Sequence, residues 1–181
     1  MDYEGITGNL LAKLKKHDEW SYWHSIRVEG YALEIGKSLG IRGNALDELS
    51  IAALLHDIGK LAIPSGILDK PGKLTPSEYQ IIKQHIHYSY QILKEYAFSE
   101  TICKAAQDHH ERSDGNGYEG KTSICLSAKI ICLSDAYDAM KHSRPYQKKK
   151  TDREVYLDLQ KNCGKQFDRE VCHVALNTLF P

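Results

Sequence analysis

Apolar residues recur at helical spacing along almost the whole chain, and this pattern constrains the fold more than any other feature. Between residues 18 and 39 they form one stripe, and Gly40 follows as a stop signal. Asn44 can cap a second helix, whose buried run at residues 49–55 leads on to Gly59. The spacing therefore predicts two helices in this part of the chain.

Turn and capping residues divide the rest of the chain. Proline and glycine punctuate a loop at residues 63–73, and a glycine-rich loop is expected at residues 111–121. The further predicted helices are 75–96, 99–110, 123–142 and two that follow caps at Thr151 and Asp168, the last of which ends near residue 179. We therefore expect an all-α bundle of about seven helices, a single domain over residues 1–181 with residues 1–17 as an N-terminal extension helix.

Composition and charge exclude several classes of protein. The 181 residues include 24 Lys+Arg and 24 Asp+Glu, and this balance argues against binding of a DNA or RNA duplex through excess basic charge. The N-terminus lacks the apolar segment of a secretory signal, and no run approaches the ~18 apolar residues that cross a membrane. Five cysteines without CxxC spacing favour reduced thiols. We therefore expect a cytoplasmic protein without a membrane span.

A histidine and an aspartate stand side by side at the end of the second predicted helix. His56 and Asp57 follow the apolar run at residues 51–55, where a charge is costly unless it is paired or bound to a metal. Adjacent helical residues project about 100° apart, so the two side chains can reach one metal from two directions, or the carboxylate can bridge two metals. Lys60, just after them, is a point charge suited to a phosphate.

Further candidate ligands occupy similar positions on other predicted helices. They lie within or at the end of apolar segments and are His24, His85, His109, His110 and Asp135. With His56 and Asp57 they form a set of imidazoles and carboxylates that suits Fe, Mn, Zn, Co or Ni better than Mg or Ca. Because this set is too large for one ion, we expect two ions that share a bridging group, ~3.5–4 Å apart.

These residues resemble the HD superfamily of metal-dependent phosphohydrolases, and within it the HD-GYP branch of cyclic-di-GMP phosphodiesterases. The resemblance covers about residues 24–180, and its motifs are LLHDIGKLAIP (54–64), ILDKPGKLTPSEY (67–79), HHERSDGNGY (109–118), AKIICLSDAYDAM (128–140), SRPY (143–146) and GKQFD (164–168). It implies an HD-type helical bundle and an enzyme that opens cyclic di-GMP to linear pGpG, to GMP or to both.

The resemblance also implies roles for single residues. His24, His56, Asp57 and Asp135 match metal ligands of the superfamily, with Asp57 as the bridge, and His85, His109 and His110 match ligands of the branch's second metal. Asp57 and Lys60 are the expected catalytic residues, Lys60 through contact with the scissile phosphate. The expected substrate contacts are Lys60, Arg112, Asp114, Gly117, Tyr118, Arg144, Tyr146 and Lys148. The implied cofactors are two divalent transition metal ions, Fe or Mn first, with Zn, Co or Ni as alternatives.

Some choices stay open at this point. Arg112 and Asp114 either fix their loop through an ion pair or touch the substrate, and Asp138 either orients a metal ligand or is a solvated carboxylate. The GYP signature of the branch reads Gly117-Tyr118-Glu119 here, with glutamate instead of proline, and the loop after it is short. Because this loop borders the substrate cleft in the family, these two departures bear on the choice of substrate. Trp20 stands where some relatives have a glutamate for a third metal, so we expect two.

Two alternative functions remain. One is an HD phosphohydrolase that acts on another cyclic dinucleotide or on a nucleotide monophosphate, in keeping with the altered signature. The other is a catalytically weak nucleotide-binding module that signals through protein partners. Substrate turnover separates the first from the second.

Overall fold

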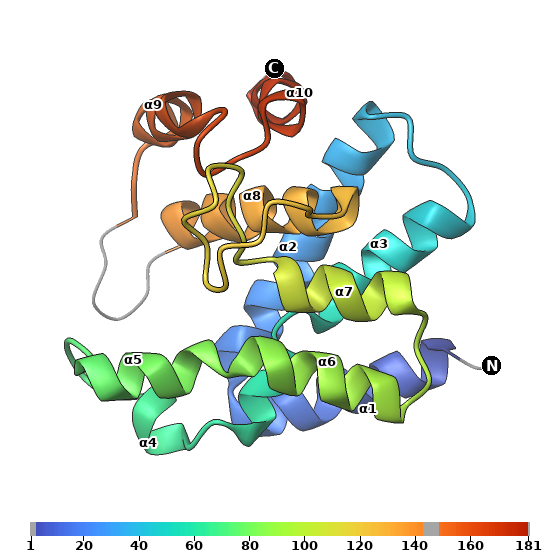
Figure 1. Cartoon of the computed structure of the whole chain (residues 1–181), viewed down its shortest axis with the longest axis vertical. Coiled ribbons are helices and arrows are strands. Elements are labelled where there is room, and N and C mark those ends of the chain that lie inside the picture. Colours follow the sequence, from blue (N-terminus) through green and yellow to red (C-terminus); the bar gives the residue numbers. More distant parts are fainter. Residues whose placement is uncertain (1–2, 143–148, 181) are drawn as a thin grey trace.

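The computed structural model describes residues 3–142 and 149–180, most of which are helical (Figure 1). Their elements are α1 (Tyr3–His17), α2 (Glu19–Ser38), α3 (Asn44–Leu55), the 3-10 helix η1 (Ile58–Ala62), α4 (Ser65–Leu68), α5 (Pro76–Lys83), α6 (His85–Glu95), α7 (Glu100–Asp108), α8 (Leu126–Lys141), α9 (Asp152–Asn162) and α10 (Arg169–Leu179). Within these two ranges no β-strand occurs, which confirms the all-α prediction. None of these helices has the length and apolar character needed to cross a membrane.

Capping side chains set where several helices begin. Thr75 and Thr151 form the two predicted capping boxes, in which each hydroxyl accepts from the backbone N–H three residues later. Asp168 caps α10 as predicted. The predicted cap Asn44 is wrong by one residue. Gly43 holds that position with a φ of 56°, a left-handed conformation that glycine adopts without steric cost.

The core lies around α2, which packs against α1, α3, α8 and α10. Val28, Ala32 and Ile35 on α2 are fully buried within it. Leu10 and Leu14 of α1 join the same core, so this first helix packs on the bundle. Burial of each Val, Leu or Ile side chain is worth about 1.5–3 kcal/mol, and this packing holds in place the helices that carry the polar site residues.

The predicted helix at residues 75–96 is interrupted at Gln84, between α5 and α6. Here the His85 ring donates from Nδ1 to the carbonyl oxygen of Ile82, at 2.6 Å. In an unbroken helix that carbonyl accepts from the N–H of residue 86, so the side chain competes with the backbone for it. The interruption leaves His85 facing the interior, where it is 1% exposed.

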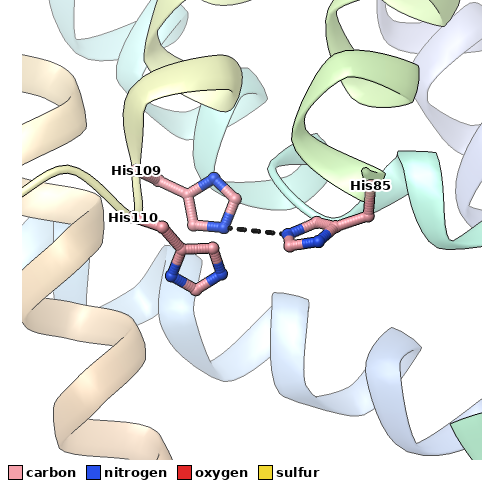
Figure 2. A group of neighbouring side chains, drawn as sticks. All are labelled: His85, His109 and His110. Atoms are coloured by element: carbon pink, nitrogen blue, oxygen red, sulfur yellow. Dashed lines mark hydrogen bonds between the residues drawn. The ribbon is translucent and has the colours of Figure 1, made fainter. Parts of the chain in front are cut away.

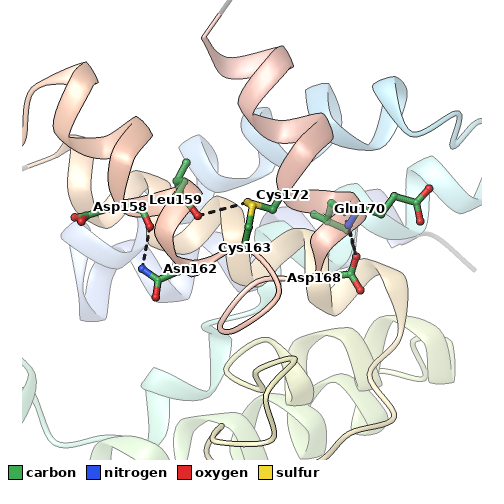
Figure 3. The surroundings of a disulfide bond; sticks show 8 residues. Asp158, Leu159, Asn162, Cys163, Asp168, Glu170 and Cys172 are labelled. Atoms are coloured by element: carbon green, nitrogen blue, oxygen red, sulfur yellow. Dashed lines mark hydrogen bonds between the residues drawn. A yellow bond between two sulfur atoms is a disulfide. The ribbon is translucent and has the colours of Figure 1, made fainter.

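A disulfide between Cys163 and Cys172 corrects the expectation of reduced thiols for this pair (Figure 3). It joins the end of α9 to α10, with Cα atoms 5.7 Å apart, and closes the turn between them. Within that turn, the carbonyl of Lys165 accepts from the N–H of Asp114 at 2.8 Å, which attaches the glycine-rich loop to it. Spacing alone could not reveal the bond, because the pairing depends on how the two helices pack.

Candidate metal centre

Three histidines at helix ends share one hydrogen-bond pattern. His56 follows α3, His109 follows α7, and His85 begins α6. Each ring donates from Nδ1 to the carbonyl oxygen three residues earlier, at 2.6–2.7 Å, and these acceptors are Ala53, Ala106 and Ile82. Because a carbonyl only accepts, each Nδ1 carries the proton and each Nε2 keeps a lone pair that can bind a metal.

His85, His109 and His110 point toward one another from two separate segments (Figure 2). One ligand atom from each lies within 4.8 Å of the others, a spacing that one ion can span. The Nε2 atoms of His85 and His109 are 3.5 Å apart. Since both rings are protonated at Nδ1, these two Nε2 atoms face each other with lone pairs, and a cation between them would stabilise that arrangement.

His24, His56 and Asp135 form a second group, also within 4.8 Å of one another. Nε2 of His24 lies 3.1 Å from Oδ1 of Asp135. Nε2 of His56 is buried and has no hydrogen-bond partner among the described residues, an arrangement that costs free energy unless a cation satisfies the nitrogen. Three imidazoles in the first group, and two imidazoles with one carboxylate in the second, are donor sets that fit transition metal ions.

Asp57 lies between the two groups. Its Oδ1 is 3.3 Å from Nε2 of His85 and 4.0 Å from Nε2 of His109. Its Oδ2 is 3.4 Å from Nε2 of His56 and 3.9 Å from Nε2 of His24. One carboxylate oxygen thus faces each group, which is the arrangement that a bridging ligand needs.

Asp138 orients His24, the one histidine of the second group whose Nδ1 bonds to a side chain. This carboxylate is fully buried in α8 and accepts from Nδ1 of His24 at 2.7 Å. Arg27 donates to the same carboxylate at 2.7 and 3.0 Å. Because Asp138 accepts the proton of Nδ1, it fixes the tautomer of His24, and it raises the basicity of the Nε2 atom that would bind a metal. Of the two roles left open for Asp138, the geometry therefore favours the orienting one.

Burial and neighbouring charges set the protonation states. Burial lowers the pKa of His85, and burial together with the His110 ring lowers that of His109 well below its usual value. Burial alone would raise the pKa of Asp57, but the Lys60 ammonium and the His56 ring hold it well below its ordinary range. Burial would lower the pKa of His24, but the carboxylates of Asp135 and Asp138 raise it above its ordinary value. Neutral His85 and His109 beside an ionised Asp57 are in the protonation states that metal binding requires.

Gly59 allows η1 to approach α6 closely enough to build this centre. A Cβ at this position would lie 2.0 Å from the carbonyl oxygen of His85 and 2.4 Å from the backbone nitrogen of Ser89. The Ser89 hydroxyl joins the two elements, accepting from the N–H of Gly59 at 2.9 Å and donating to the His56 carbonyl at 2.8 Å. Lys60 follows, with its Nζ 2.6 Å from Oδ2 of Asp57.

Glu111, which the sequence analysis did not single out, organises the glycine-rich loop. Its buried carboxylate accepts from the N–H groups of Glu119 at 2.7 Å and Lys121 at 2.9 Å. A Cβ on Gly117 would lie 2.4 Å from Oε2 of Glu111, so this glycine is needed for close packing. The only sequence signal was the position of Glu111 directly after two candidate ligands.

Three of the four predicted substrate contacts in this loop border a polar cavity of about 340 Å³ that reaches His110 and Asp135. Arg112, Gly117 and Tyr118 line it. The Tyr118 ring lies 4.4 Å from that of His110. Arg112 pairs with Asp114 through two bonds of 2.9 and 2.7 Å, which favours the loop-fixing role for both. The remaining predicted contacts, Arg144, Tyr146 and Lys148, lie outside the described residues.

Comparison with known proteins identifies relatives of this chain. A cyclic di-GMP phosphodiesterase of Thermotoga maritima is 35% identical over 97% of this chain and 50% of its own length. The 3'3'-cGAMP-specific phosphodiesterase 3 of Vibrio cholerae is 37% identical over 84% of this chain and 34% of its own length. The chain therefore spans half or less of the length of these curated relatives.

Solved structures show the same fold. The HD domain of the L. monocytogenes phosphodiesterase PgpH, in complex with cyclic-di-AMP, superposes with a TM-score of 0.74 at 21% identity. That match covers 94% of this chain and 93% of the other. The HD domain family model matches residues 10–171, nearly the whole sequence. This chain therefore belongs to the HD domain family.

Proposed function

We propose that this chain is a two-metal phosphodiesterase that hydrolyses a cyclic dinucleotide, with cyclic di-GMP as the leading substrate and residues 1–181 as one HD-GYP-like domain. The observation that carries the proposal is the position of Asp57, whose two oxygens face two separate groups of histidines. The relatives support the substrate class, since their names refer to cyclic di-GMP or 3'3'-cGAMP.

The two groups would hold the two ions, Fe or Mn by preference. His24, His56 and Asp135 form one set, His85, His109 and His110 form the other, and Asp57 is shared. When bound, such ions lower the pKa of water and neutralise charge on phosphoryl oxygens. Because Nδ1 of each helix-end histidine is held by a carbonyl, the rings keep their orientation without substrate.

Lys60 is the proposed positive group for the substrate phosphate. Its ammonium lies 2.6 Å from Oδ2 of Asp57 and 3.1 Å from the Ser21 hydroxyl, so two contacts hold it beside the bridge. A fixed ammonium at this place stabilises the negative charge that develops on the phosphate during attack by water. The loop around Tyr118 would contact the nucleotide, and another cyclic dinucleotide is the second substrate to test.

The test is a turnover assay on protein reconstituted separately with Fe(II), Mn(II) and Zn(II). Cyclic di-GMP, 3'3'-cGAMP, cyclic di-AMP and nucleoside monophosphates are supplied, and chromatography resolves the products. We expect cyclic di-GMP to be consumed and pGpG or GMP to appear. If no member of the panel is consumed with any metal, the proposal is rejected.

His56→Ala and Asp57→Ala should abolish turnover and remove metal while circular dichroism shows unchanged helical content. The matched control is His87→Ala, because His87 lies on the same helix as His85 but is 39% exposed and 3.4 Å from Glu119. The control should keep its activity and metal. Full activity in either of the first two variants would contradict the assignment.

A further inference from the structure

A second cavity, of about 320 Å³, opens on the Lys60 side of the metal centre. Its walls come from the start of α2, from η1, from α4 and α5, and from the segment between these last two helices. They include the apolar side chains of Trp20, Ile67, Leu74 and Ile82. This volume is at the lower end of the ~300–1,000 Å³ that small-molecule sites occupy, and apolar walls are typical of such sites.

Trp20 lies between this cavity and the metal centre. Its ring lies nearly parallel to the imidazole of His24, with centroids 4.9 Å apart and planes inclined by 15°. Nζ of Lys60 is 5.9 Å from the centroid of the Trp20 ring and 2.6 Å from Oδ2 of Asp57. Between the cavity and the metal centre, the Trp20 ring therefore comes first, then the Lys60 ammonium, and then the Asp57 carboxylate.

We propose that this cavity is the subsite for one purine base of the substrate, with Trp20 as its stacking surface. The inference rests on the proposed function. If a phosphate of the substrate binds at Lys60, the base that is joined to it through one sugar reaches the cavity. Every nucleobase has a flat π-face that stacks on indole, and the aliphatic walls exclude water from the stacked base. The polar cavity beside His110 would take the other half of the molecule.

Intrinsic fluorescence tests the subsite directly, because Trp20 and Trp23 are the two tryptophans of the chain. Trp23 lies on the same helix and is 46% exposed. Trp23→Phe leaves Trp20 as the sole indole, and Trp20→Phe leaves Trp23. The metal-loaded variants are titrated with a phosphorothioate analogue of cyclic di-GMP that resists hydrolysis. We expect saturable quenching in Trp23→Phe and none in Trp20→Phe, while inorganic phosphate quenches neither.

Steady-state kinetics provide a second test of the subsite. Trp20→Ala should raise KM by about 5- to 150-fold, the range expected for loss of one stacked base, with a smaller effect on kcat. Trp20→Phe, which keeps a ring, should recover part of this loss, and Trp23→Ala should match the wild type. Metal content is measured in each variant, because Trp20 also packs on His24.

The outcomes separate this inference from the proposed function. If the wild type hydrolyses cyclic di-GMP but the analogue does not quench Trp20, the subsite is wrong and the function stands. If nothing is hydrolysed but the analogue quenches Trp20, the proposed hydrolysis is rejected, and the cavity is a base-binding subsite of a protein that binds the nucleotide without turnover. If Trp20→Ala loses metal and no quenching occurs, Trp20 only supports His24 and the subsite is overturned.

Discussion

Gly59 allows η1 and α6 to lie close together. Replacing it by alanine tests whether the geometry of the metal centre depends on that short distance. The new Cβ would lie 2.0 Å from the His85 carbonyl oxygen and 2.4 Å from the Ser89 nitrogen, whereas real Cβ contacts essentially never fall below 3.0 Å. Both clashing atoms are backbone, so a rotamer change cannot relieve them. The two elements must separate by about 1 Å or more, a displacement that can cost about 100-fold in rate when it misaligns a site.

That displacement acts on the contact between Asp57 and His85, whose Oδ1 and Nε2 atoms are 3.3 Å apart. We therefore expect Gly59→Ala to lower kcat/KM by about 100-fold and to weaken metal binding at the group that contains His85. The free energy of unfolding should fall by about 1–3 kcal/mol, as for other overpacked sites. Elemental analysis, the turnover assay and urea unfolding measure the three effects.

Gly30→Ala is the matched control for this change. Gly30 lies on the exposed side of α2, and within residues 3–142 and 149–180 a Cβ there meets nothing closer than 4 Å. Activity should be unchanged, and stability should rise by about 0.5–1 kcal/mol because alanine loses less backbone entropy on folding. If Gly59→Ala keeps both wild-type metal content and wild-type kcat/KM, close packing of η1 on α6 does not build the site and the reasoning is refuted.

Three further predictions concern other parts of the molecule. Asp138→Asn removes the charge beside His24, so metal affinity in a chelator competition should fall about 10- to 100-fold, and an unchanged affinity would rule out the orienting role. Replacing Cys163 and Cys172 by serine opens a loop with a sequence separation of 9, and the free energy of unfolding of the oxidised protein should fall by about 2.5 kcal/mol, whereas a reductant should not affect the variant. The pKa of His109 is lowered from 6.5 on folding, so below that pH the unfolded chain binds more protons than the folded one. Metal-free protein should therefore lose stability in urea as pH falls from 7 to 5, and a pH-independent midpoint would contradict the burial of neutral imidazole.

Local chemistry made much of the fold predictable. The capping boxes at Thr75 and Thr151 lie where the sequence indicated, because a cap depends only on residues within one helical turn. The break at Gln84 was missed because its cause is the His85 ring, which bonds to a carbonyl instead of pointing to solvent. The bond between Cys163 and Cys172 was missed because it depends on how α9 and α10 approach each other.

The sequence by itself determined the helical class and the residue types available at the site, because apolar periodicity and the cost of a buried charge act over short distances along the chain. Only the tertiary structure decided how those residues are grouped. It separates the candidate ligands into two sets around Asp57 and bonds Asp138 to His24. These contacts join residues up to 114 positions apart, so they depend on which buried helix faces pack together.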